Sequence, residues 1–67
     1  MEFRDIDGVV FIKFHKEWNW QNNMNWYAFI NSKNLGIDYF YVDAKGITCY
    51  IVKDEKKWAL NRIKYGI

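Results

Sequence analysis

The pair of residues with the greatest chemical potential in this chain is His15 and Cys49. They are its single histidine and single cysteine, and a thiol beside an imidazole is the minimum equipment for nucleophilic catalysis. Alternation along the expected strands places His15 on an open sheet face and Cys49 on the covered face. We therefore expect a histidine at a strand end and a buried, apolar cysteine rather than a catalytic pair.

The sequence also lacks the residues of other common catalytic and metal sites. One histidine and one cysteine cannot complete a Cys/His zinc site, and the chain has neither a glycine-rich phosphate loop nor an HExxH motif. Asp54 and Glu55 stand at the expected start of a helix, where negative charge is stabilising without any catalytic role. The sequence thus predicts a protein that is not an enzyme and uses no metal or cofactor.

Two strands and a helix are expected in the first half of the chain. Residues 8–15 are β-branched and aromatic, which favours a strand. The dipeptide at residues 7–8, Asp-Gly, is a strong hairpin signal, so that residues 2–6 would form a short edge strand. Asn19 can cap a helix over residues 19–33, which ends before the next glycine.

The second half predicts a hairpin followed by a helix. Residues 37–43 and 47–53 have the composition of strands and are joined by a short turn that contains a glycine. Asp54 can cap a last helix over residues 55–65, which Gly66 ends. The apolar arc of this helix that is expected to face the core consists of Ala59, Leu60 and Ile63.

These elements predict one α+β domain over residues 1–67. The order (β)βαββα fits a small antiparallel sheet of three or four strands with two helices on one face. The other sheet face would then be open, as a dimer interface or a nucleic-acid surface. By alternation of side chains, the open face is expected to carry Phe11, Lys13, Tyr39, Tyr41 and Tyr50.

Aromatic residues make up 21% of the chain, with four Trp, five Tyr and five Phe. Large aromatic rings bury the most area per residue in the core of a small domain, but fourteen aromatic residues are more than one small core needs. Trp, Tyr and Arg are also the residues most enriched among interface hot spots. The sequence therefore predicts partner-binding residues on the two helices, namely Trp58, Arg62 and Tyr65 on the last helix and Trp26 and Phe29 on the first.

Charge and hydropathy limit the partners and the location. The net charge of +2 is too small to demand nucleic acid, although residues 53–67 carry five basic side chains against two acidic ones. The longest apolar run, residues 9–12, is far shorter than a membrane span, and the N-terminus does not resemble a secretory leader. A lone cysteine fits a reducing compartment. We expect a cytoplasmic protein that does not bind a membrane.

Two short resemblances to known families suggest alternatives. Residues 10–13 resemble the first-strand motif of RNA-recognition-motif domains, and residues 45–46 resemble the start of their third-strand motif. Positions 47 and 49 lack the aromatic residues on which that family stacks bases. The order of elements in residues 35–67 is similar to the hairpin and helix of ACT-type effector-binding domains. Shared architecture does not transfer function, so neither resemblance carries its family's activity to this chain.

The leading hypothesis is a stand-alone protein-binding module that acts by stoichiometric contact. Such a module would inhibit or modulate a larger cytoplasmic enzyme or complex, as mobile-element inhibitors of the anti-CRISPR type do. One alternative is a single-stranded nucleic-acid binder that stacks bases on the open sheet face. Another is an ACT-like small-ligand regulator. A homodimer is compatible with all three hypotheses.

Overall fold

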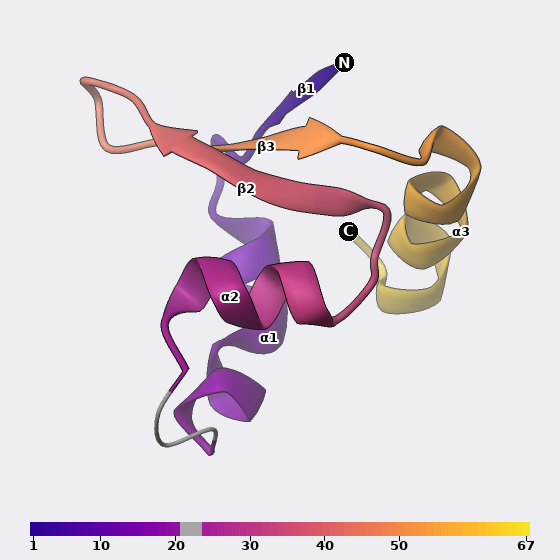
Figure 1. Cartoon of the computed structure of the whole chain (residues 1–67), viewed down its shortest axis with the longest axis horizontal. Helices are drawn as coiled ribbons and strands as arrows, with labels where there is room; N and C mark the ends of the chain where they lie inside the picture. The colour runs from indigo at the N-terminus through magenta and orange to yellow at the C-terminus, as the bar shows by residue number, and fades with distance from the viewer. Residues whose placement is uncertain (21–23) are drawn as a thin grey trace.

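The chain folds into one small antiparallel sheet with helices packed against one of its faces (Figure 1). The computed structural model describes residues 1–20 and 24–67. Within these ranges the elements are β1 (Glu2–Arg4), α1 (Val9–Asn19), α2 (Trp26–Ser32), β2 (Ile37–Val42), β3 (Thr48–Val52) and α3 (Glu55–Tyr65). The strands lie in the order β1-β3-β2, with α1 and α2 below the sheet and α3 beside its end (Figure 1). The fold is therefore the small mixed α+β type that the sequence predicts.

The core fills the space between the sheet and the helices. The sheet contributes Ile37, Tyr50 and Val52, none of which is more than 8% exposed. The Tyr50 hydroxyl accepts a hydrogen bond from Trp26 Nε1 at 3.0 Å, so its polar tip is satisfied inside the core. Burial raises the pKa of Tyr50 to about 12. The helices contribute Val10, Phe14, Phe29, Ile30 and Trp58.

The strand expected over residues 8–15 is wrong, because these residues form most of α1. Val10 and Phe14 are four residues apart and both buried, which is helical spacing. The Asp5 carboxylate accepts hydrogen bonds from the backbone N–H groups of Val9 at 2.8 Å and Val10 at 3.0 Å. This cap and the burial of one helix face outweigh the strand preference of β-branched residues. In place of a hairpin turning at residues 7–8, β1 pairs with β3.

The first predicted helix, over residues 19–33, is replaced by a shorter one. Asn19 is the last residue of α1, and α2 is capped by Asn25, whose Oδ1 accepts from the Ala28 N–H at 3.0 Å. Residues 21–23 of the expected helix lie outside the described part of the chain. Both asparagines are suitable N-caps by type, so residue type alone does not select between them.

The expected hairpin of β2 and β3 forms, with a bulge that changes its faces. Tyr39 pairs with Tyr50 and Tyr41 pairs with Cys49, so Phe40 is an extra residue in β2. The extra residue shifts the alternation of side chains beyond it. Tyr39 and Tyr50 consequently face the helices, whereas Tyr41 faces away from them. The sheet therefore does not have the open face with three tyrosines that simple alternation predicts.

Asp5 should make the stability of the fold depend on pH. The residue is 5% exposed, and burial raises the pKa of its carboxyl group although hydrogen bonds from Val10 and Val9 lower it. The carboxyl group of Asp5 thus binds its proton more tightly in the folded state than in the unfolded state. The resulting stabilisation is complete below the unfolded pKa and is lost as the pH rises through the folded pKa.

The variant Asp5→Asn keeps an oxygen acceptor for the helix N-terminus but carries no charge at any pH. As the pH rises through the window between the unfolded and folded pKa of Asp5, the free energy of unfolding of the wild type should fall relative to that of the variant. Urea unfolding of both proteins at a series of pH values measures this difference. If the difference in the free energy of unfolding between the two proteins does not change with pH, the pKa of Asp5 is not raised by folding.

Candidate functional site

α3 carries the candidate site, and its two ends are well defined. Asp54 Oδ1 accepts a hydrogen bond from the Lys57 backbone N–H at 3.0 Å, which caps the helix as the sequence predicts. The helix ends at Gly66, whose φ of 70° lies in the left-handed region that glycine adopts without strain. Residues 55–65 thus form the predicted helix.

One side of α3 anchors the helix to the rest of the domain. Trp58 is 4% exposed and belongs to the core. Asn61 Nδ2 donates a hydrogen bond to the Leu35 carbonyl oxygen at 3.1 Å, and the Tyr65 ring meets the Phe14 ring edge-on with centroids 4.9 Å apart. These contacts set the rotation of α3, so its opposite side faces water.

That opposite side presents aliphatic side chains to solvent. Leu60 and Ile63 are 69% and 81% exposed, and their spacing makes them neighbours on the helix surface. Ala59 extends the row on the helix, and Ile67, which follows the end of α3 and is partly buried against the core, lies beside it. A shallow depression of about 350 Å³ is lined by Ala59, Arg62, Ile63 and Ile67. Scattered exposed aliphatic residues are common, but a contiguous row is a candidate interaction surface. We call Ala59, Leu60, Ile63 and Ile67 the α3 ridge.

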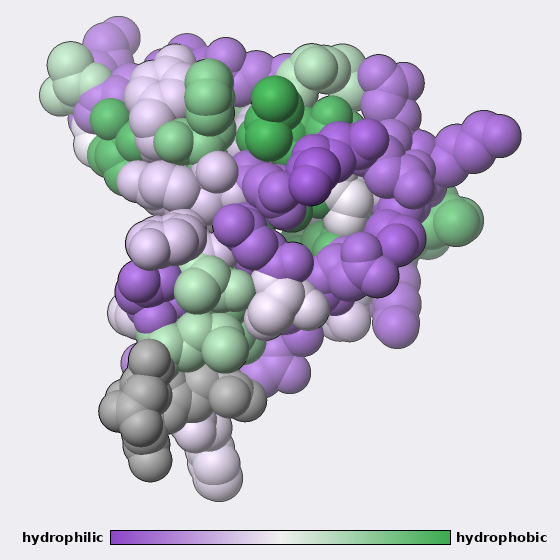
Figure 2. Space-filling view, in the orientation of Figure 1, coloured by the Kyte–Doolittle hydropathy of each residue, from purple (hydrophilic) through white to green (hydrophobic). Residues whose placement is uncertain are grey.

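Basic side chains surround the α3 ridge. The exposed cations of the helix are Lys56, Arg62 and Lys64, while Glu55 is acidic. Lys13 of α1 also reaches the C-terminal end of α3. Hydrophilic side chains cover this part of the molecule, and an apolar side chain protrudes among them (Figure 2). The ridge is therefore an apolar strip that is bordered by positively charged side chains.

Arg62 is the best-positioned of these cations. Its guanidinium lies over the rings of Phe3 and Trp58, with distances of 5.4 and 5.9 Å from Cζ to the ring centroids. Contact with the two rings restrains the side chain, so a carboxylate on a partner would order it at a lower entropic cost. Arg62 thus joins the anchored side of α3 to the exposed ridge.

The predicted partner-binding residues divide between core and surface. Trp58 and Phe29 are 4% and 3% exposed, so the prediction that they lie on the surface is wrong. Trp26 and Tyr65 are half-buried, and Arg62 is exposed. The two sides of α3 are reversed relative to expectation, because large rings bury more area than aliphatic side chains and occupy the core side.

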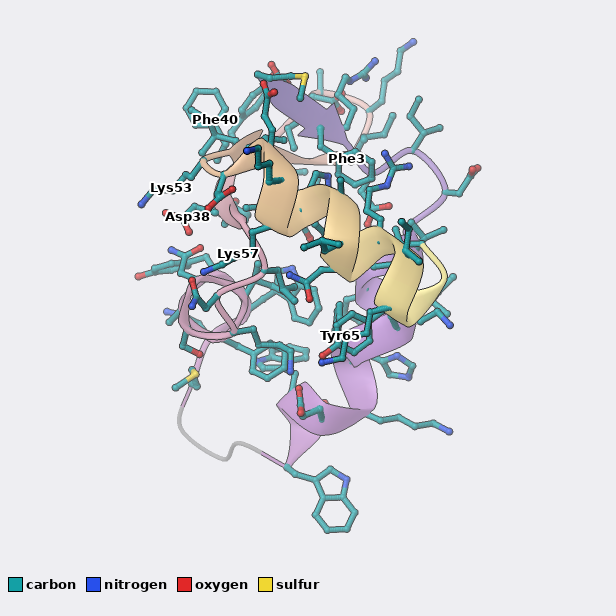
Figure 3. The ribbon with its side chains drawn as sticks, turned by 90° about the vertical axis from the view of Figure 1, so that its right-hand side faces the viewer. Phe3, Asp38, Phe40, Lys53, Lys57 and Tyr65 are labelled. Atoms are coloured by element: carbon teal, nitrogen blue, oxygen red, sulfur yellow. The ribbon has the colours of Figure 1, made fainter. Side chains whose placement is uncertain are left out.

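A second exposed surface is the sheet face that is turned away from the helices, which we call the outer sheet face. Phe40, Tyr41 and Ile51 are 55%, 41% and 40% exposed there, and Phe40 lies on the far side of the sheet from α1 and α2 (Figure 3). The charged residues that share this face are Glu2, Arg4, Asp38, Asp43 and Lys53.

The cations of the outer sheet face are paired with carboxylates of the same chain. Arg4 forms an ion pair with Asp43, and Lys53 Nζ lies 3.1 Å from Asp38 Oδ2. The hydrogen bond from Arg4 holds the pKa of Asp43 below its ordinary value. The face therefore combines exposed apolar side chains with two internal ion pairs and one further carboxylate, that of Glu2.

Tyr41 and Cys49 are neighbours on this face. Hydrogen bonds with Cys49 and Glu2 raise the pKa of Tyr41 to about 12, and the Tyr41 hydroxyl donates to Glu2 Oε1 at 3.1 Å. The phenol thus stays protonated at neutral pH. Cys49 is fully buried although it belongs to the outer sheet face, because its register partners Arg4 and Tyr41 flank it.

The residues that were expected to share an open sheet face do not share one, and His15 and Cys49 lie on different elements, α1 and β3. His15 lies on α1, where Nδ1 is 3.1 Å from the Phe11 carbonyl oxygen, whereas Cys49 belongs to the outer sheet face. The expected open-face residues are distributed over three places, with Phe11 and Lys13 on α1, Tyr39 and Tyr50 toward the helices, and Tyr41 on the outer sheet face.

A polar depression of about 270 Å³ lies where α2, the start of β2 and α3 approach one another. Its lysines are already engaged within the chain, because Lys57 Nζ donates to Asn34 Oδ1 at 3.0 Å and Lys53 pairs with Asp38. Figure 3 shows Asp38, Lys53 and Lys57 around this depression. It therefore gives little support to a small-ligand site.

Residues 1–20 and 24–67 contain neither a group of three metal-ligating side chains nor a helix that could cross a membrane. In these ranges no three His, Cys, Asp or Glu side chains are grouped so that they could hold a metal ion. The helices of the same ranges are also too short and too polar to cross a bilayer. Comparisons of the chain with protein-family models, with curated proteins and with solved structures give no match, so its function has to be argued from its own residues.

Proposed function

We propose that this chain is a non-enzymatic protein-binding module that acts by stoichiometric contact through the α3 ridge. The observation that carries the proposal is the exposure of Leu60 and Ile63, at 69% and 81%, on a helix whose other side is anchored. Burial of two such side chains contributes about 3–6 kcal/mol before the costs of association. Leu60 and Ile63 are three residues apart and Ala59 and Ile63 are four residues apart on α3, a spacing that fits recognition of a helix by an apolar groove.

The partner should offer an apolar groove with carboxylates at its rim. Lys56, Arg62 and Lys64 surround the ridge, and complementary charges accelerate association and fix the orientation of docking. Because these cations are exposed to solvent, added salt should weaken binding. A larger cytoplasmic enzyme or complex is the partner that we propose, with this chain as an inhibitor or modulator of the kind that mobile elements encode, including the anti-CRISPR type.

The single-stranded nucleic-acid alternative has less support. Phe11, Tyr39, Tyr41 and Tyr50 do not share a face, so they cannot form one stacking surface. The cations near Tyr41 are paired with carboxylates, which reduces their attraction for phosphate. We therefore place the interaction on α3.

The proposal predicts that Leu60→Asp and Ile63→Asp each abolish partner capture while the protein stays folded. Either change puts an unpaired carboxylate into an apolar contact, which is costly to bury. Ile12→Asp is the matched control, because Ile12 is 63% exposed on another helix, α1. Affinity capture from cells with tagged wild type and the three variants, at low and moderate salt, is the measurement.

We expect the wild type and Ile12→Asp to retain the same stoichiometric partner and the two α3 variants to lose it. Circular dichroism of all four proteins establishes that each is folded. If the α3 variants retain the partner, or if Ile12→Asp alone loses it, the site is not on α3.

A further inference from the structure

We propose that a hollow between the β1–α1 link and the β2–β3 turn binds a small molecule that carries an aromatic ring and a carboxylate. The hollow has a volume of about 500 Å³, which exceeds the volumes of the two depressions described above and falls within the range of small-molecule sites. The β1–α1 link passes beside the start of β3, where the Asp5 backbone N–H donates to the Thr48 carbonyl oxygen at 2.9 Å (Figure 1). The lining lies outside α3, so the inference is independent of the function proposed for that helix.

Aromatic rings form one wall of the hollow. Phe11 on α1 is 46% exposed, and its ring centroid lies 5.1 Å from that of Trp26, which is half-buried at the start of α2. The two rings are inclined at 55° to each other, so they offer both a face and an edge to a third ring, the two contacts that aromatic groups prefer. Ile6 and Ile47 supply aliphatic contacts elsewhere in the lining. This wall therefore favours a flat, apolar group.

Two glycines keep the hollow open. Gly8 and Gly46 both line it, and a Cβ at either position would have no atom within 4 Å. A flat group can therefore approach the backbone at both positions without an intervening side chain. Thr48 lies in the lining beside them and adds a hydroxyl group that can donate a hydrogen bond to a ligand oxygen.

Lys45 is the charged residue of the lining that can pair with a ligand. Its side chain is exposed, and in the part of the chain that the structure describes its ammonium group forms no ion pair with a carboxylate. The nearby carboxylate of Asp43 is engaged, because it accepts from the Lys45 backbone N–H at 2.8 Å and pairs with Arg4. The Lys45 ammonium can therefore bind an anionic group of the ligand.

Asp5 is the other charged residue of the lining, and its charge is already compensated. Its side chain is 5% exposed, and its two carboxylate oxygens accept hydrogen bonds from the Val9 and Val10 backbone N–H groups. The positive end of the α1 dipole offsets its negative charge. Asp7 is exposed and lies outside the lining. The charge that remains for a ligand is that of Lys45, which selects a carboxylate over an amine.

Titration of the full chain with three ligands of similar shape tests the proposal. Indoleacetate, tryptophol and tryptamine carry a negative charge, no charge and a positive charge on the same ring system. Two-dimensional amide NMR spectra locate the site, and we expect all three to shift the signals of Gly8, Gly46 and Thr48. At low salt indoleacetate should bind about three- to fivefold more tightly than tryptophol, the effect of one exposed ion pair. Tryptamine should bind more weakly than tryptophol.

Lys45→Met separates the charge of the site from its shape, because it keeps an apolar side chain of similar length. This variant should bind indoleacetate no more tightly than tryptophol, with the affinity for tryptophol unchanged. Phe11→Ala should weaken all three ligands by about threefold or more, through loss of one ring contact. Lys56→Met is the matched control, since it removes an exposed cation of α3, and it should change none of the affinities. Circular dichroism shows whether each variant is folded.

The proposal is overturned if the three ligands leave the signals of Gly8, Gly46 and Thr48 in place. Tighter binding of tryptamine than of indoleacetate would overturn it too, because Asp5 rather than Lys45 would then set the charge preference. Equal binding of indoleacetate by the wild type and by Lys45→Met would show that Lys45 does not hold the carboxylate. Partner capture through α3 is measured with other variants, so the two proposals fail separately.

Discussion

Replacing Trp58 by alanine is expected to lower the free energy of unfolding by about 3–5 kcal/mol, the usual cost of removing a large buried ring. Trp58 is 4% exposed and packs against Phe3 with ring centroids 5.2 Å apart. A domain of this size has a total stability of about 3–10 kcal/mol, so much of the variant should be unfolded at body temperature. Urea unfolding followed by far-UV circular dichroism is the measurement.

Ile63→Ala is the matched control for Trp58→Ala, because it truncates a neighbouring side chain of the same helix that is 81% exposed. It should change the free energy of unfolding by no more than about 0.5 kcal/mol. The two variants also distinguish an effect on folding from an effect on binding, because Trp58→Ala should lose partner capture only through loss of the fold. A folded Trp58→Ala variant with unchanged stability would show that α3 does not pack as described.

Gly36→Ala is expected to destabilise the protein by about 3 kcal/mol or more, through backbone strain combined with overpacking. Gly36 has a φ of 94°, and a Cβ at this position would lie 2.7 Å from both the Asp54 carbonyl oxygen and the Trp58 amide nitrogen. Both obstacles are backbone atoms at the start of α3, so they cannot move aside as a flexible side chain can. The thermal and urea unfolding midpoints of the variant measure the effect.

Gly46→Ala isolates the backbone strain, so the difference between the two variants measures the effect of the collision. Gly46 has a φ of 80°, but a Cβ there would have no atom within 4 Å. This variant shares the unfavourable backbone conformation without the collision and should lose only about 1–2 kcal/mol. Equal losses in the two variants would mean that α3 does not approach Gly36 closely.

The hairpin and α3 could be predicted because their local signals agree with one another. Asp54 caps α3 and Gly66 ends it at the predicted positions, and the strand composition of β2 and β3 is flanked by turn residues. The bulge at Phe40 was missed because a bulge depends on packing across the sheet, and it decides which tyrosines face the helices. Element types were therefore easier to predict than side-chain directions.

α1 could not be predicted from composition because two local signals conflict. The β-branched and aromatic residues of this segment favour a strand, whereas the spacing of Val10 and Phe14 is helical. The conflict is resolved by Asp5, whose carboxylate caps the helix from outside the segment, and by the burial of one helix face. A search for helical spacing beside a preceding acidic cap would have found α1.

The candidate site was missed for a related reason. α3 has an aromatic side with Trp58 and Tyr65 and an aliphatic side with Leu60 and Ile63, and either could face a core when the helix is considered alone. The choice depends on tertiary partners such as Phe14, which meets Tyr65. The available signal was the presence of two apolar sides on one short helix, because only one of them can be buried in a two-layer domain.

Because Cys49 is buried in the sheet, the reactivity of its thiol can be used to measure how often the sheet opens locally. The thiol has no exposed surface, and its sulfur is 3.7 Å from the Ile47 carbonyl oxygen, so a thiol reagent can reach it only when β1 or the neighbouring residues open. The labelling rate therefore reports the free energy of local opening at this one place, separately from global unfolding. Because Cys49 is the single cysteine of the chain, this opening can be followed in the unmodified protein.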